Sequence, residues 1–313
     1  MRHAIIDCGT NTFNLLVADT SDSGWNVVFQ NKLPVKLGAG GFANHEIMPS
    51  RFVRGLDALF CHKHNILNFE CHHVHVFATS AIREAGNGSD FVANAKTLFD
   101  FDIKVIDGER EAELIYKGVS RTIDLGDKPS LIMDIGGGST EFIIADRTGV
   151  YWKKSFLLGV SRLHERISPS ARMSSDEVNT LHDLLDEELK PLKEALDQYE
   201  VTRLIGSSGS FDTLFELYVE GTNQKNFVHQ LSNEIPLETF PGIHAWLMGS
   251  TFEERMKHPV IPAIRAEYMP LASFLVYYVL GMKKFEKLYH SAYSLKEGAM
   301  VEFMGQGAGS SAH

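Results

Sequence analysis

Two acids in this chain each end a short apolar stretch and precede a run of small residues. Asp7 precedes CGTNT (Cys8–Thr12), and Asp134 precedes IGGGST (Ile135–Thr140). Glycine and small hydroxyl residues let backbone N–H groups approach an anion closely. Carboxylate, water and phosphate oxygens are the ligands that Mg²⁺ prefers. The pattern indicates two phosphate-binding turns, each with an acid placed where a hydrated Mg²⁺ would lie.

Other readings of these residues stay open. An acid at the end of a strand can simply accept hydrogen bonds from the N–H groups of a turn. A third run of small residues, GSSGS (Gly206–Ser210), follows a short apolar stretch and is predicted to be a loop. The sequence has no GxxxxGK[ST] or HExxH motif and no zinc-like histidine spacing. Five clustered histidines are interpreted as solvated side chains: His62, His64, His72, His73 and His75.

The two acidic turns need strands on both sides. The pattern predicts strand–turn–strand units at 4–19 and at 131–146. This repeat implies two similar α/β halves with a cleft between them, and 122–129 is the best candidate linker. The predicted first domain is 1–122 plus about 296–313, and the predicted second domain is 123–295.

The remaining elements follow from periodicity and capping signals. A helix after Gly108 has a buried face at Ala112, Ile115, Tyr116 and Val119. Ser174 and Glu177 form a capping box that opens a helix, which Pro191 should kink. Further predictions are a helix over 53–67, strands over 74–78 and 103–106, mostly helices over 243–304, and a disordered tail over 305–313.

Composition limits the class of protein. The 313 residues have 44% hydrophobic and 22% charged residues and a net charge of −10, which excludes a disordered chain and disfavours bulk nucleic acid or anionic membrane as partners. Three cysteines without a CxxC pair indicate reduced thiols in a cytoplasmic protein. The N-terminus does not read as a signal peptide. The most apolar stretch, 270–282, is too short to span a bilayer and is predicted to be a buried helix.

Six motifs, in order along the chain, resemble the exopolyphosphatase/guanosine pentaphosphate phosphohydrolase (Ppx/GppA) family. They are AIIDCGTNTFNLL (4–16), ATSAIREA (78–85), IDGEREAELIYKGV (106–119), DIGGGSTE (134–141), GSSGSFDTL (206–214) and SLKEG (294–298). The resemblance implies an α/β fold of two RNase H-like domains, as in actin, sugar kinases and Hsp70, with a cleft between the domains. It also implies Mg²⁺-dependent release of terminal phosphate from polyphosphate or from the 5′ end of pppGpp.

The resemblance also assigns roles to individual residues. It places the catalytic glutamate at Glu111, whereas the residues alone do not choose among Glu109, Glu111 and Glu113. Arg83 and Arg265 match arginines that would bind phosphate. The predicted metal ligands are Asp7, Asp134 and Glu141. The other predicted phosphate-binding residues are Gly9, Thr10, Asn11, Thr12, Gly136, Gly137, Gly138, Ser139, Thr140, Gly206, Ser207, Ser208, Gly209 and Ser210.

Some positions depart from the family pattern and leave substrate preference open. Asn14 stands where many members have arginine, and Arg110 replaces the first glutamate of an EEA motif. Lys36 and Lys296 stand where arginine is frequent, and Ser210 replaces a threonine. The chain ends soon after SLKEG, so we expect it to lack the C-terminal helical domains of long members. A kinase or ATPase of the same superfold and a non-catalytic polyphosphate or pppGpp sensor remain alternatives, and a homodimer stays open.

Overall fold

The computed structural model of the protein describes residues 1–21, 24–222 and 230–307, the last three of these by their backbone alone. The chain forms two compact units. One contains 1–118 and the segment from Ser294 onwards, and the other contains 119–293. The chain therefore leaves the first unit after Gly118 and returns to it at Ser294.

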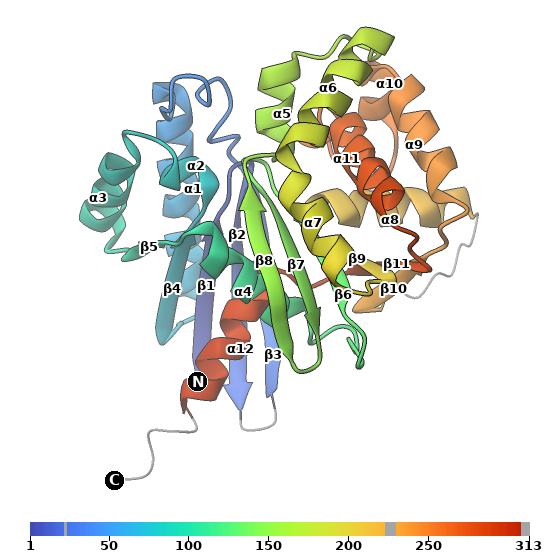
Figure 1. Ribbon diagram of the computed structural model, residues 1–313. Coiled ribbons are helices and arrows are strands. Elements are labelled where there is room, and N and C mark those ends of the chain that lie inside the picture. The colour runs from blue at the N-terminus through green and yellow to red at the C-terminus, as the bar shows by residue number, and fades with distance from the viewer. Residues whose placement is uncertain (22–23, 223–229, 308–313) are drawn as a thin grey trace. The chain divides into compact units, whose positions relative to one another are not determined.

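The first unit is built around a five-stranded sheet with the order β3-β2-β1-β4-β5 (Figure 1). The strands β1, β2 and β3 pair antiparallel, whereas β1, β4 and β5 pair parallel. Its elements are β1 (Arg2–Cys8), β2 (Thr12–Ser21), β3 (Gly24–Pro34), α1 (Pro49–Asn68), β4 (His73–Ala78), α2 (Ser80–Arg83), α3 (Gly88–Phe99), β5 (Ile103–Val105), α4 (Gly108–Val119) and α12 (Leu295–Gly307).

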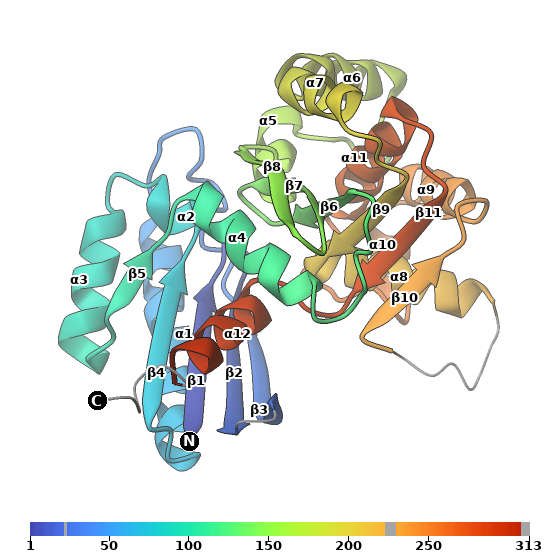
Figure 2. The same cartoon turned by 60° about the horizontal axis from the view of Figure 1, so that its bottom comes forward.

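Helices cover both faces of this sheet. Successive residues of a strand point to opposite faces, and β1 and β2 have buried apolar residues on each face. Ala4, Ile6 and Cys8 pack in one core with residues of α1 and α3. Ile5 lies on the opposite face and is fully buried as well. The helix α12 packs against β1 and β2, and it crosses in front of them in Figure 2. Buried Ala299 and Met300 form the apolar face of α12.

The second unit contains a six-stranded sheet with the order β10-β11-β9-β6-β7-β8. Helix α11 is buried from Met269 to Val276 and at Val279, as expected for the apolar stretch at 270–282, whereas Tyr277 is 48% exposed. The elements are β6 (Ser130–Ile135), β7 (Thr140–Asp146), β8 (Gly149–Phe156), α5 (Val160–Ile167), α6 (Ser175–Glu188), α7 (Lys190–Gln198), β9 (Arg203–Ser207), α8 (Ser208–Gly221), β10 (Ser232–Ile235), α9 (Phe240–Gly249), α10 (Phe252–Lys257), α11 (Met269–Met282) and β11 (Lys287–Ser291).

The two sheets share one topology. In each sheet, a meander of three antiparallel strands continues into parallel strands beside the first strand of the meander. This is the strand order 3-2-1-4-5 of the RNase H-like fold, with β10 as an additional antiparallel edge strand in the second unit. The predicted fold class and the predicted repeat of two hairpins are therefore confirmed.

Several local predictions need correction. The capping box at Ser174 is present, but Pro191 marks the start of a new helix, α7, rather than a kink within one helix. Helices do dominate 243–304, as predicted, and strand β11 lies between α11 and α12. The predicted disordered tail begins as the last turn of α12, and residues 308–313 lie outside the described part.

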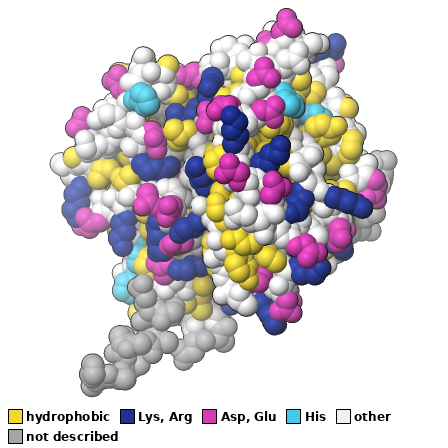
Figure 3. Space-filling view, in the orientation of Figure 1, with side chains coloured by type: hydrophobic (Ala, Val, Ile, Leu, Met, Phe, Trp, Pro, Cys, Tyr) yellow, Lys and Arg dark blue, Asp and Glu magenta, His cyan; other side chains and the backbone are white. Residues whose placement is uncertain are grey.

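The surface carries charged side chains of both signs. Basic and acidic side chains alternate over the face seen in Figure 3. Within the described ranges, no helix is both long enough and apolar enough to cross a membrane. The three cysteines are free, with Cys8 buried and Cys61 exposed.

Candidate functional site

The turn between β6 and β7 is held from behind by α5. The amide of Gly136 donates to the carbonyl of Ser139 at 3.0 Å and closes the turn. The carbonyls of Gly136 and Gly137 accept bonds from the amides of Val160 and Ser161, at the start of α5. The next carbonyl, that of Gly138, accepts from Nε of Arg162 at 2.9 Å. Three successive carbonyls of the turn therefore point towards α5.

This anchoring fixes the direction of the amides. In a planar trans peptide, the N–H group points away from the carbonyl of the same peptide unit. The amides of Gly137, Gly138 and Ser139 therefore point away from α5. Gly159 allows the close approach that this arrangement needs, because a Cβ atom there would lie 2.4 Å from backbone atoms of Gly137 and Gly138. A row of parallel amides of this kind is suited to an anion.

The turn between β1 and β2 has the same construction with a different anchor. The amide of Gly9 donates to the carbonyl of Thr12 at 3.1 Å. The carbonyls of Thr10 and Asn11 accept bonds from the segment 35–37 that follows β3. By the same peptide geometry, the amides of Asn11 and Thr12 point away from that segment. The two closing glycines are also equally confined. A Cβ atom at Gly9 would lie 3.0 Å from the carbonyl oxygen of Thr12, and one at Gly136 would lie 2.9 Å from that of Ser139.

The acid of the second turn has another acid directly opposite it. Asp134 on β6 is paired in register with Glu141 on β7, and the two residues are only 4% and 1% exposed. The hydroxyls of Ser207 and Ser208 both donate to Oδ2 of Asp134 at 2.7 Å. The hydroxyl of Ser155 on β8 donates to Oε1 of Glu141 at 2.6 Å. Two buried carboxylates on facing positions repel each other, which a cation bound between them would offset.

The acid of the first turn faces an amide instead. Asp7 is paired in register with Asn14, and Nδ2 of Asn14 donates to Oδ2 of Asp7 at 3.0 Å. Asp7 is half-buried, in contrast to Asp134. Asn14, a position where many family members have arginine, thus acts directly on the predicted metal ligand of the first unit.

The segment 206–210 is not a loop, so this prediction was wrong. Strand β9 runs to Ser207, and α8 begins at Ser208 without an intervening turn. Ser208 takes up the change of direction with a φ of +68°, a conformation that non-glycine residues rarely adopt and that often occurs at functional sites. Ser207 and Ser208 are thereby brought to Asp134.

Arg265 lies over the first turns of α8. Its Nη1 donates to Oγ1 of Thr213 at 2.8 Å, and its Nη2 is 3.4 Å from Oδ2 of Asp212. Gly209 makes room for the guanidinium, since a Cβ atom there would lie 2.2 Å from Nη2 of Arg265. Burial lowers the pKa of Arg265 from its ordinary value, although Asp212 counteracts this effect. The structure therefore brings Arg265 and Gly206–Ser210 together, as neighbours in one unit.

Glu111 and Arg83 form an ion pair in the first unit. Nη1 of Arg83 lies 3.0 Å from Oε2 of Glu111 and also donates to the carbonyl of Ile106 at 2.8 Å. Arg83 also pairs with Glu84, at 2.9 Å. Burial alone would lower the pKa of Arg83, but the charge and hydrogen bond of Glu111, together with Glu84, raise it. The guanidinium favours the ionised form of the Glu111 carboxylate.

The surroundings now distinguish the three glutamates at the start of α4. Glu111 is 7% exposed and faces Arg83, whereas Glu109 is exposed. Glu113 lies 3.0 Å from Arg110. Arg110 also pairs with Glu302 of α12, which is 2.5 Å from Nζ of Lys117. The departure from the family pattern at Arg110 therefore joins α4 to α12.

The histidine prediction was wrong for His62. Its side chain is fully buried, and its Nε2 is 3.2 Å from the carbonyl of Phe13. His75 is half-buried as well, with its ring stacked on Phe303 of α12 at a centroid distance of 3.5 Å. The pKa of His75 is lowered to about 4, mainly by burial and to a smaller extent by the charges of His3 and Lys104.

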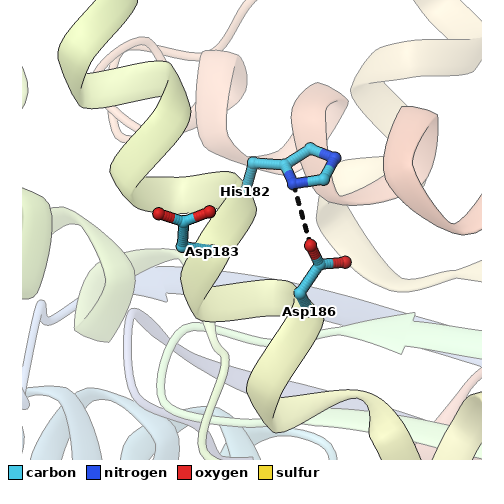
Figure 4. Close-up of side chains that lie close together, drawn as sticks. All are labelled: His182, Asp183 and Asp186. Carbon is cyan, nitrogen blue, oxygen red and sulfur yellow. Dashed lines mark ion pairs between the residues drawn. The ribbon is translucent and has the colours of Figure 1, made fainter.

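Two groups of side chains in the described part of the chain have donor atoms that could bind a metal ion. Asp134 and Glu141 supply buried carboxylate oxygens on facing strands, a donor set that fits Mg²⁺. In the described residues, a different group, His182, Asp183 and Asp186, has three donor atoms within 4.8 Å of one another. All three are exposed, and Figure 4 shows His182 and Asp186 facing each other as an ion pair at 3.2 Å. Asp186 also accepts from the hydroxyl of Tyr278, so this group reads as a surface network.

Sequence reasoning missed the residues that support the site. Ser155 donates to Glu141, and Gly159 and Arg162 contact the turn of the second unit. The segment 35–37 holds the turn of the first unit. The register of the β7–β8 hairpin, which pairs Glu141 with Ser155, would have revealed Ser155. The contacts of α5 and of 35–37 depend on tertiary structure and leave no local signal.

The fold and the two acidic glycine turns define a class: two-unit α/β proteins in which each unit carries one such turn. Residues 16–306 match the Ppx/GppA phosphatase family, and the chain belongs to that family. A crystal structure of an exopolyphosphatase from Cytophaga hutchinsonii is 35% identical, covers 98% of both chains and superposes with a TM-score of 0.95. A Ppx-GppA enzyme from Aquifex aeolicus, 23% identical over 96% of this chain and 99% of its own, shares the fold with a TM-score of 0.79.

Curated relatives are more distant and longer. A guanosine-5′-triphosphate,3′-diphosphate pyrophosphatase from Photobacterium profundum is 28% identical over 215 residues, which are 69% of this chain and 43% of the relative. One of the same name from Vibrio atlanticus is 29% identical over 215 residues. The match spans less than half of the length of these relatives.

Proposed function

We propose that this protein is a phosphohydrolase that releases the terminal phosphate of inorganic polyphosphate, converts pppGpp to ppGpp, or does both. The observation that carries the proposal is the buried pair of Asp134 and Glu141 beside a glycine turn whose amides point away from their anchor. Such a site combines N–H donors for phosphate oxygens with carboxylates for a divalent cation. Phosphoryl transfer depends mainly on positioning and charge stabilisation.

The predicted residues fall into phosphate-binding, proton-transfer and metal-binding groups in this proposal, and Arg83, predicted to bind phosphate, is assigned to Glu111 instead. The amides at 11–12 and 137–139 bind phosphate oxygens, whereas those of Gly9 and Gly136 close the turns. Arg265 with the start of α8 binds further phosphates. Glu111 accepts a proton from the attacking water, and Arg83 keeps Glu111 charged and oriented through their ion pair. Turnover therefore depends on the ionised form of Glu111.

Asp134 and Glu141 are the proposed Mg²⁺ ligands, and Asp7 is the corresponding candidate in the first unit. Bound Mg²⁺ would neutralise charge that develops on the transferring phosphoryl group. The serine hydroxyls that donate to Asp134 hold its carboxylate in place for this purpose.

Similarity supports polyphosphate as the first substrate to test. The relative from Cytophaga hutchinsonii that matches along almost the whole chain is named an exopolyphosphatase. The pyrophosphatases that act on guanosine-5′-triphosphate,3′-diphosphate match over a shorter part. We place the reaction in the cytoplasm, in keeping with the reduced cysteines.

Phosphate release from short polyphosphate, long polyphosphate, pppGpp and ATP, measured side by side with Mg²⁺, tests the proposal. We expect release from polyphosphate or pppGpp to exceed release from ATP. ATP hydrolysis as the dominant activity would favour the kinase or ATPase alternative. Tight binding of polyphosphate or pppGpp without any release would identify a sensor.

A further inference from the structure

The second unit contains a cavity of about 300 Å³ that is lined by neither the acidic turn nor Arg265. Its walls come from α5, α10, the start of α11 and the segment 169–173. Most of the lining is apolar, including Met173, Met248, Phe252 and Leu271. Two charged groups interrupt it, Arg255 and the ion pair of His164 with Glu267 at 3.6 Å. The cavity has the volume and mixed lining of a small-molecule site.

The guanidinium of Arg255 has hydrogen bonds to two of its three nitrogens but no ion pair among the described residues. It is only 5% exposed, and its Nε donates to the carbonyl of Ala266 at 2.6 Å. Its Nη1 donates to the carbonyl and the hydroxyl of Ser250. In the parts of the chain that the structure describes, no carboxylate forms an ion pair with Arg255, and Nη2 has no hydrogen-bond partner. A buried guanidinium ordinarily has an acidic partner.

Two of the neighbouring acids are engaged elsewhere. Glu254 accepts from the amide of Thr251 as part of a capping box, and it lies 3.8 Å from Arg172. Glu267 pairs with His164 across the cavity wall. Burial lowers the pKa of Arg255 from its ordinary value, although Glu253 and Glu254 oppose this effect. A ligand that brought one negative charge to Nη2 would supply what this environment lacks.

We propose that this cavity binds a small monocarboxylate with a short apolar tail. The carboxylate would accept hydrogen bonds from Nη2 of Arg255, and the tail would lie against Met173, Met248 and Leu271. A phosphate group is a poorer fit, because its higher charge would meet Glu267 and its several oxygens would need more donors than Nη2 offers. This site is independent of the proposed hydrolysis.

The walls of the cavity adjoin both parts of the candidate site in this unit. Ala266, which holds Arg255, follows Arg265 directly in the chain. His164 belongs to α5, whose first turn holds the carbonyls of Gly136 and Gly137. An occupant would therefore contact α5, which anchors the glycine turn, and Glu267, two residues after Arg265.

Binding can be measured on the full chain by NMR of ¹³C-methyl-labelled methionine, with butyrate as the probe. We expect saturable shifts of the Met173 and Met248 signals with butyrate. Butanol and butylamine, which have the same tail with a neutral or positive head, should bind at least tenfold more weakly. Equal affinity for butyrate and butanol would overturn the proposal, because it would show an apolar cavity without an anion site. An absence of saturation would overturn it too.

Two variants locate the binding. Ala171→Phe fills the cavity from an exposed position of its rim and should abolish butyrate binding, whereas Ala93→Phe, on the exposed face of α3, should not. Arg255→Lys keeps the charge but loses the Nη2 donors, and it should weaken butyrate binding at least tenfold. Because Arg255 also holds Ser250, the melting temperature of this variant is measured in parallel. Butyrate binding that survives Ala171→Phe would place the ligand elsewhere and refute the assignment.

Discussion

The turns after β1 and after β6 have the same construction, and the residue paired with the acid differs between them. Both are closed by the same glycine amide bond and anchored through two or three successive carbonyls. The residue opposite the acid is Asn14 in the first unit and Glu141 in the second. The first pair has one carboxyl group, which accepts a hydrogen bond from the amide, whereas the second pair has two carboxyl groups and is buried. The same backbone is therefore suited to an anion in both units, but only the second places two carboxyl groups opposite each other, as a divalent metal site requires.

The carboxylate proposed as general base comes from another element of the first unit. Glu111 comes from α4 and has a cation, Arg83, beside it. A buried carboxylate with its own arginine is held in the charged form that a general base needs. In the proposed mechanism, the first unit would supply proton transfer and the second would supply metal binding.

The largest effect is expected from Glu111→Gln, which tests this division of labour. Glutamine is nearly isosteric but cannot accept the proton, so we expect turnover to fall about 10²–10⁴-fold, the usual cost of losing a general base. Substrate binding should be retained, and kcat and KM measured together separate the two quantities. Glu109→Gln is the matched control, because Glu109 is exposed two positions earlier on the same helix. Loss of turnover in the control alone would move the general base to Glu109.

The second effect concerns the anchor of the glycine turn. A methyl group at Gly159 would lie 2.4 Å from the backbone of Gly137 and Gly138, so Gly159→Ala must push α5 and the turn apart. Overpacking of this kind costs about 1–3 kcal/mol of unfolding free energy. We expect denaturant unfolding to show this loss together with a rise in KM. Gly242→Ala, with nothing within 4 Å of the new methyl group, is the control. Unchanged KM would mean that the turn does not bind substrate.

The third effect separates the two acids. Asp134→Asn should raise the Mg²⁺ concentration that gives half-maximal activity by about 10- to 100-fold, as changes around metal sites commonly do. Asp7→Asn should raise it less, because Asp7 has an amide rather than a second carboxylate opposite it. Activity titrations against Mg²⁺ measure both variants. If the midpoint for Asp134→Asn were that of the wild type, Asp134 would be only a strand-ending acid bound by serines.

The sequence predicted those parts of the molecule whose chemistry is local. A strand, an acid and a run of glycines are contiguous, so both hairpins and their turns could be predicted from spacing alone. Glu111 could be chosen only through the family motif, because its burial and its pairing with Arg83 join residues 28 positions apart. The register of each hairpin, which makes the difference between Asn14 and Glu141 meaningful, was likewise not predicted.

The failures share a physical cause, which is tertiary override of local preference. Small polar residues favour loops, yet Ser207 ends a strand and Ser208 starts a helix because both hydroxyls bind Asp134 in a neighbouring strand. Histidine favours the surface, yet His62 is buried against the carbonyl of Phe13. Strand β3 was missed because most of its residues are polar or exposed and its pairing depends on β2.

The smallest effect tests whether one residue accounts for the difference between the turns. Asn14→Asp gives the first turn the two facing carboxylates of the second and removes the hydrogen bond from Asn14 to Asp7. Like charges on facing strand positions cost about 0.2–1 kcal/mol, so we expect the melting temperature to fall by a few degrees at neutral pH. Mg²⁺ should then restore the melting temperature, because a ligand that binds only the folded state stabilises it by mass action. Asn14→Ala loses the same hydrogen bond without adding charge, so it should be destabilised but insensitive to Mg²⁺. If Mg²⁺ stabilised both variants equally, the residue opposite the acid would not decide between the two kinds of turn, and the difference would have to lie in the burial of Asp134.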